Sequence, residues 1–114
     1  MTIMVAVTGD GLGEVALEAA LAEGSRRGAD VLALNLRPEP LDVSHGAGVT
    51  VVDRPLGVED GDAVLERLAK DDDIDLLVIG VRRRSPVGKA ILGDVAQRLL
   101  LEAEVPVLAV KPGR

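Results

Sequence analysis

With 114 residues, 47% of them hydrophobic and 28% charged, the chain is long enough for one domain, 1–114, around a single core. A formal net charge of −6 and the lack of Phe, Tyr and Trp argue against a nucleic-acid partner, which normally needs a basic face or aromatic stacking. The absence of cysteine excludes disulfides, thiolate metal sites and thiol catalysis, and a single histidine argues against a Ser/His/Asp triad.

The amino-terminal third predicts a strand, a turn and a helix. TIMVAVT is a continuous apolar run, typical of a buried parallel strand, at about residues 2–8. GDGLG, residues 9–13, lacks both the GxGxxG spacing and the P-loop lysine, so we interpret it as a tight turn before a helix over 14–27 that ends at Gly28. Because MTIMVAVTGDG has no basic leader and soon reaches glycine, we expect a cytoplasmic protein without a membrane partner.

The middle of the chain predicts two strands separated by a long loop. ADVLALNLRPEP gives a second strand at about 31–36, closed by prolines that cannot continue a ladder. Residues 38–57 are rich in proline and glycine, so we expect a loop with one short strand at about 49–53. His45 lies in this loop with no second ligand at metal spacing, and we interpret it as solvated.

The last part predicts two more helix–strand pairs. A helix over 57–73 precedes IDLLVIG, a strand at 74–80, and a loop over 80–94 leads to a helix at 94–104 and a strand from Val105 to Lys111. This alternation predicts an α/β, three-layer, Rossmann-like fold with a doubly wound parallel sheet of five strands. Ligands of such folds bind beyond the carboxyl ends of the strands.

The loop GVRRRSPVGKAILGD, residues 80–94, reverses the acidic character of the chain. It holds four basic residues, Arg82, Arg83, Arg84 and Lys89. Glycines at both ends allow backbone amides to approach an anion, and the following helix N-terminus attracts negative charge, so a phosphate would suit this place. Alternatively, the arginines are solvated and Asp94 only caps the helix, since Asp is a preferred capping residue. The residues alone leave both interpretations open.

This loop resembles the signature of the universal stress protein family, which is Gly, two residues, Gly, nine residues, then Gly followed by Ser or Thr. Here the four signature positions are Gly80, Arg83, Gly93 and Asp94, so the spacing is kept. IMVAVTGD and VPVLAVKP resemble the family's first and last strands, and the resemblance covers nearly the whole chain. It implies the strand order 3-2-1-4-5.

A homodimer through the last strand, Val105 to Lys111, is also expected. VPVLAVK is apolar, carries one charge, and would lie at a sheet edge that invites pairing. Members of the family that the chain resembles commonly dimerise there.

The resemblance also implies a set of binding residues. In nucleotide-binding members the loop glycines and the hydroxyl residue cradle the phosphates, and an Asp at the end of the first strand holds the nucleoside. In this chain Thr8 stands at that Asp position, with Asp10 two residues onward. The apolar positions that flank the adenine correspond to Leu36 and Ile79. The candidate nucleotide- or anion-binding residues are Thr8, Leu36, Ile79, Gly80, Arg83, Gly93, Asp94 and Val95.

Asp94 stands where the family signature has Ser or Thr, and this difference determines which function we expect. It removes a hydrogen bond worth roughly 1 kcal/mol and adds ~1–4 kcal/mol of repulsion toward a phosphate. We therefore expect a binding or regulatory module, not an enzyme, with a degenerate nucleotide-type site in which Asp94 caps the helix and pairs with a loop arginine. The alternative is a functional stress protein that binds ATP or another adenine nucleotide through Arg83 and Arg84. No catalytic or metal-binding residues are expected.

Overall fold

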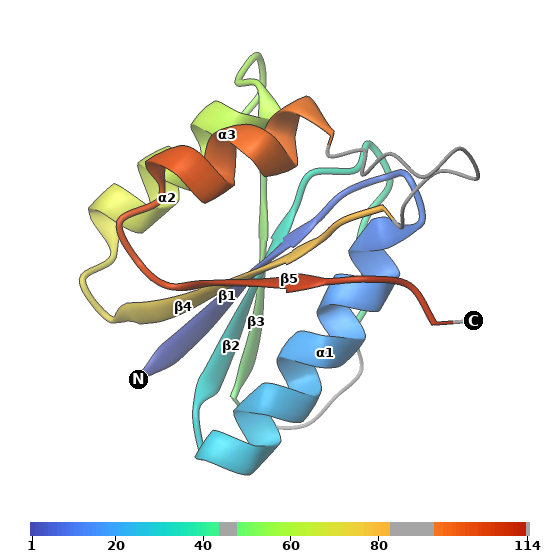
Figure 1. Ribbon diagram of the computed structural model, residues 1–114. Helices are drawn as coiled ribbons and strands as arrows, with labels where there is room; N and C mark the ends of the chain where they lie inside the picture. The colour runs from blue at the N-terminus through green and yellow to red at the C-terminus, as the bar shows by residue number, and fades with distance from the viewer. Residues whose placement is uncertain (44–47, 83–92, 114) are drawn as a thin grey trace.

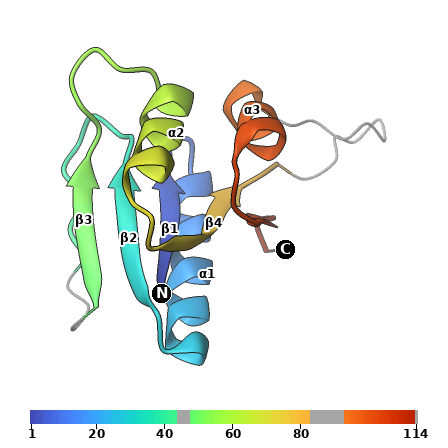
Figure 2. The same ribbon diagram turned by 90° about the vertical axis from the view of Figure 1, so that its left-hand side faces the viewer.

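The computed structural model describes residues 1–43, 48–82 and 93–113 (Figure 1). Five strands form one parallel sheet in the order β3-β2-β1-β4-β5, as expected. Figure 2 shows β3, β2, β1 and β4 side by side. The strands are β1 (Thr2–Val7), β2 (Asp30–Asn35), β3 (Val49–Asp53), β4 (Ile74–Gly80) and β5 (Val107–Val110). The helices are α1 (Leu12–Arg27), α2 (Asp60–Lys70) and α3 (Asp94–Glu102).

The sheet lies between two helical layers, so the three-layer fold predicted from the sequence is confirmed. Because side chains alternate along a strand, β1 buries Met4 on the face covered by α2 and α3, and Ile3 and Val5 on the face covered by α1. All three side chains are fully buried. This two-sided burial explains why the central strands are continuous apolar runs rather than alternating ones.

The predicted elements differ from the observed ones mainly at their ends. α2 is shorter than the predicted 57–73, because Gly57 has a left-handed φ of 79° that belongs to a turn, and because the acids after Lys70 oppose a helix C-terminus. β5 is shorter than Val105 to Lys111. Pro106 has no N–H to add to the ladder, although its carbonyl accepts a hydrogen bond from the Leu77 amide at 3.0 Å.

The first and third helices and the first two strands also shift by one or two residues. α3 ends at Glu102 rather than at 104. Pro106 follows closely, and helices usually end at or before the residue that precedes a proline, because that residue disfavours helical backbone. β1 ends at Val7, one residue before Thr8, and α1 begins at Leu12 rather than 14. Among the described helices, none combines the length and the apolar character that a bilayer-spanning segment needs.

Candidate functional site

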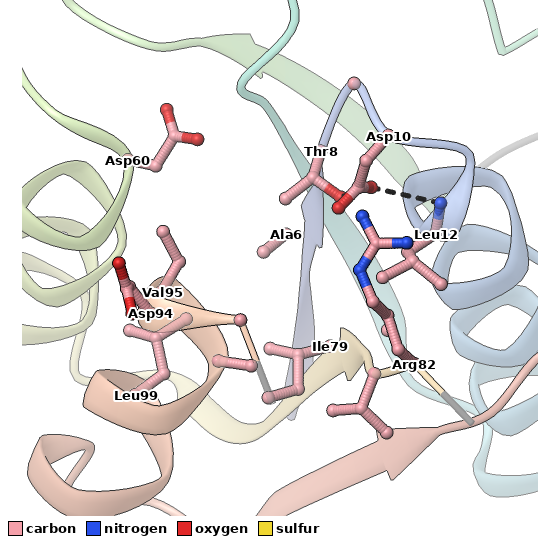
Figure 3. Close-up of a pocket in the computed structure, with 15 residues that line it drawn as sticks. Ala6, Thr8, Asp10, Leu12, Asp60, Ile79, Arg82, Asp94, Val95 and Leu99 are labelled. Atoms are coloured by element: carbon pink, nitrogen blue, oxygen red, sulfur yellow. Dashed lines mark hydrogen bonds between the residues drawn. The ribbon is translucent and has the colours of Figure 1, made fainter. Parts of the chain in front are cut away.

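A pocket opens where β1 and β4 end, at the starts of α1, α2 and α3 (Figure 3). The chain leaves these two neighbouring strands toward opposite edges of the sheet, because β1 leads to β2 and β4 leads to β5. Such a switch point leaves a crevice at the carboxyl ends of the strands. The pocket has a volume of about 330 Å³, at the lower end of the ~300–1000 Å³ typical of small-molecule sites.

The floor of the pocket is apolar and its rim is polar. The floor consists of Ala6, Ile79, Val81, Val95, Ala96 and Leu99. Figure 3 shows Thr8, Asp10 and Arg82 on the side of α1, and Asp60 and Asp94 on the side of α2 and α3. The described lining residues therefore include three carboxylates, those of Asp10, Asp60 and Asp94, and one guanidinium, that of Arg82.

Most of the candidate residues named from the sequence meet in this pocket. Thr8, Ile79, Gly80, Gly93, Asp94 and Val95 all line it. Leu36 does not line it, because its side chain is 4% exposed and packs in the core on the face of α2 and α3. Arg83 lies outside the described residues, as do Arg84, Lys89 and His45.

Gly80 is required by packing inside the protein. A Cβ added there would lie 2.6 Å from the carbonyl oxygen of Leu12 and 2.8 Å from the Leu12 Cβ. Gly13 is constrained in the same way, since its added Cβ would lie 2.3 Å from the carbonyl oxygen of Thr8. The first turn of α1 thus contacts the ends of β4 and β1 through backbone atoms, which positions one wall of the pocket.

Gly93 has no such requirement among the described residues. Its φ of −65° and ψ of 158° are accessible to any residue. No described atom lies within 4 Å of a Cβ added there. A side chain at this position would instead enter the open space at the start of α3, where Gly93 lines the pocket.

Asp94 does not cap α3, so the sequence-based prediction of a cap is wrong. The helix begins at Asp94 itself, the N-cap is Gly93, and no side chain makes a capping hydrogen bond. Because Asp94 stands in the first helical turn, its charge still interacts favourably with the helix dipole. No described residue forms an ion pair or hydrogen bond with its carboxylate. The predicted arginine partner, if one of those at 83 or 84, falls outside the described residues.

The end of β1 carries a hydroxyl–carboxylate pair. The Thr8 hydroxyl donates to Oδ1 of Asp10 at 2.6 Å, and the Leu12 amide donates to the same oxygen at 3.1 Å. Gly11, with a φ of 83°, provides the left-handed turn that brings these groups together. The sequence showed an acid after the strand but gave no signal that it returns to the pocket.

Besides Asp10, two charged residues of the described pocket lining were not in the sequence-based set. Asp60, the first residue of α2, lines the pocket and forms an ion pair with Arg54. The position of Asp60 at the pocket depends on how α2 packs on the sheet, and no local sequence pattern indicates that packing. Arg82, the residue that follows Val81 after β4, was noted only as part of a basic loop.

An ion pair joins the two helices beside the pocket. Arg98 of α3 donates to Oδ1 of Asp62 in α2 at 2.6 Å, and the hydrogen bond to this carboxylate raises the pKa of Arg98 above its ordinary value. Gly61 leaves room for the guanidinium, since a Cβ there would lie 2.9 Å from Nη1 of Arg98. The pair helps to place the start of α3, with Asp94, beside the start of α2.

Comparisons with known proteins agree with one another. The model of the universal stress protein family matches residues 41–111. A universal stress protein of Mycolicibacterium smegmatis is 41% identical, over 96% of this chain and 97% of that protein. The solved structure of a universal stress protein from Archaeoglobus fulgidus has a TM-score of 0.75 at 29% identity, covering 97% of this chain and 98% of that one.

A second solved structure supports the fold alone. A protein from the universal stress protein family of Burkholderia pseudomallei has a TM-score of 0.59 at 19% identity, covering 96% of this chain and 94% of that one.

The different surroundings of the two glycines predict different effects of alanine. Gly80→Ala should lower the free energy of unfolding by ~1–3 kcal/mol, because the new methyl group overlaps Leu12. Gly93→Ala is the matched control and should change it by less than ~0.5 kcal/mol, as at an unconstrained surface position. Urea denaturation of both variants and the wild type measures the difference, and equal losses would contradict the packing argument.

Proposed function

The chain belongs to the universal stress protein family, and we propose that it is a cytoplasmic binding or regulatory module with a degenerate nucleotide-type site. The proposal includes no enzymatic step. The pocket at the switch point of the sheet is the proposed site. Its apolar floor and the open approach to Gly93 suit a small ligand, whereas its rim disfavours a polyanion.

Asp94 is the observation that carries this proposal. Its carboxylate lines the pocket at the start of α3, where the family signature has a hydroxyl, and no described residue neutralises it. Arg82 lies on the opposite side of the pocket in Figure 3. A phosphate beside Asp94 would meet ~1–4 kcal/mol of repulsion, which corresponds to a loss of affinity of roughly 5- to 1000-fold.

A functional ATP-binding protein is the second candidate, and Arg82 is the observation that favours it. Its guanidinium lines the pocket and forms no ion pair with any described residue. Charge-assisted hydrogen bonds from arginine to phosphate are strong, so Arg82 would offset part of the repulsion from Asp94. Arg83 and Arg84 would have to supply the remaining phosphate contacts in this alternative.

Calorimetric titration with ATP at one fixed salt concentration distinguishes the two candidates. Wild-type protein should bind ATP weakly or not at all, and Asp94→Ser should raise the affinity at least ~10-fold, because repulsion is replaced by a hydroxyl donor. Asp72→Ser is the matched control. It removes the same charge from an exposed residue before β4, at the other end of the strands, and should have little effect.

Either of two outcomes would contradict the proposed degenerate site. Tight, stoichiometric binding of ATP by the wild type would favour the alternative candidate. An equal gain in Asp94→Ser and Asp72→Ser would attribute the effect to net charge rather than to the place of Asp94 in the pocket.

The proposed assembly is a homodimer paired through β5. This strand pairs with β4 on one side and with no other described strand, so its outer edge carries unpaired backbone groups. Its four residues, Val107–Val110, are all apolar and only partly buried or exposed. An apolar edge of this kind is a template for pairing with a second strand. A two-fold axis would make the pairing self-complementary.

Light scattering at micromolar concentration tests the proposed dimer. Wild-type protein should have twice the chain mass of 11.9 kDa, and Ala109→Lys should be monomeric, because it places a charge in the paired edge. Ala109 is exposed in the single chain, so the change should not disturb the core. Thr50→Lys, at an exposed position of the opposite edge strand β3, is the control and should remain dimeric. A wild-type monomer or a dimeric Ala109→Lys variant would refute the assembly.

A further inference from the structure

The first half of α3 forms one wall of the pocket, and few polar contacts hold it there. The α3 residues that line the pocket are Asp94, Val95, Ala96 and Leu99 (Figure 3). In the described part of the chain, only one hydrogen-bonded ion pair joins α3 to another helix or strand. It is the bond from Arg98 to Oδ1 of Asp62 in α2, at 2.6 Å. The position of this wall therefore depends on that pair and on apolar packing.

The two ends of α3 are anchored differently. Its carboxyl end leads through residues 103–106 into β5, and the Pro106 carbonyl accepts a hydrogen bond from the Leu77 amide of β4 at 3.0 Å. Its amino end begins at Asp94, whose carboxylate bonds to no described residue, and no described atom lies within 4 Å of a Cβ added to Gly93. A movement of α3 would thus pivot about its carboxyl end and displace the wall of the pocket.

Arg98 fits closely against α2, yet water reaches the pair. A Cβ added to Gly61 would lie 2.9 Å from Nη1 and 3.2 Å from Cδ of Arg98, so glycine leaves the space that this side chain occupies. The side chains of Arg98 and Asp62 are 38% and 43% exposed. Because the pair is exposed, dissolved ions screen its attraction.

We propose that the Arg98–Asp62 pair is a salt-sensitive latch, which holds the start of α3 against the pocket floor and opens the pocket when the pair separates. Exposed ion pairs change an equilibrium by roughly 1.4- to 5-fold, so the latch opens reversibly. The opposite wall has no such device, because backbone contacts at Gly13 and Gly80 fix α1 to the sheet. The latch governs access to the pocket and does not depend on which ligand the pocket takes.

Alkylation of a thiol placed in the wall measures this opening, since the chain has no cysteine of its own. Ala96→Cys is the reporter, because Ala96 lines the pocket, is only 9% exposed, and a thiol packs like a small apolar group. Iodoacetamide is small and uncharged, and it reaches a buried thiol when α3 moves away. On this background, Asp62→Asn should raise the alkylation rate ~2- to 5-fold at low salt. Asp71→Asn, which removes the Arg67–Asp71 pair at the other end of α2, is the matched control and should leave the rate unchanged.

Two further results distinguish a latch from a loss of helix stability. Added salt should accelerate alkylation of the reporter protein but not of its Asp62→Asn variant, because the pair that salt screens is then absent. Gly61→Ala keeps both charges and favours helix formation in α2. It should nevertheless accelerate alkylation, since its Cβ displaces the guanidinium of Arg98. Combining Gly61→Ala with Asp62→Asn should give no further increase, because both changes release the same latch.

Hydrogen exchange followed by mass spectrometry gives a second measurement in the cysteine-free chain. Asp62→Asn should accelerate exchange in α3 and leave exchange in α1 unchanged. Unchanged rates in Asp62→Asn, an equal increase in Asp71→Asn, or an increase shared by α1 would overturn the latch. None of these outcomes affects the calorimetric test of ATP binding, so the proposed function is tested separately.

Discussion

The close contact of α1 with the ends of β1 and β4 is the constraint on which the site depends. Gly13 and Gly80 allow backbone atoms to meet where any Cβ would overlap Thr8 or Leu12. This contact fixes the turn that carries Asp10 relative to the floor of the pocket. A glycine in the family signature therefore has a structural reason to be present, independent of any ligand.

The opposite wall of the pocket is built differently. There the starts of α2 and α3 are joined by side chains, with Arg98 bonded to Asp62, and the backbone at Gly93 remains open. The carboxylates of Asp60 and Asp94 face this side in Figure 3. The wall beside α1 is thus positioned by backbone packing at Gly13 and Gly80. The wall beside α2 and α3 carries the charge of Asp94, which a single substitution can change. In the proposed site, Asp94 changes the charge at the start of α3, whereas the glycine contacts of the other wall do not involve this side chain.

Local patterns predicted the sheet well, because strands buried on both faces appear as continuous apolar runs such as IDLLVIG. The strand order came from the family resemblance, which also pointed to Gly93 and Asp94. Errors arose where an outcome depends on backbone geometry or on distant packing. A shift of one residue in the start of the helix decides whether Asp94 caps α3 or begins it. The packing of Leu36 into the core and the approach of Asp60 to the pocket depend on tertiary contacts that no sequence window contains. The return of Asp10 toward Thr8 depends on the local backbone turn at Gly11.

We propose that the pocket keeps the frame of a nucleotide-type site and that the Asp94 carboxylate stands where a phosphate would bind. Native mass spectrometry of the purified wild-type protein tests this most directly, because a tightly bound ligand remains attached at its own mass. The account predicts a protein mass with no ATP or ADP retained. Stoichiometric retention of ATP would contradict it and show that the charge of Asp94 is neutralised within the site.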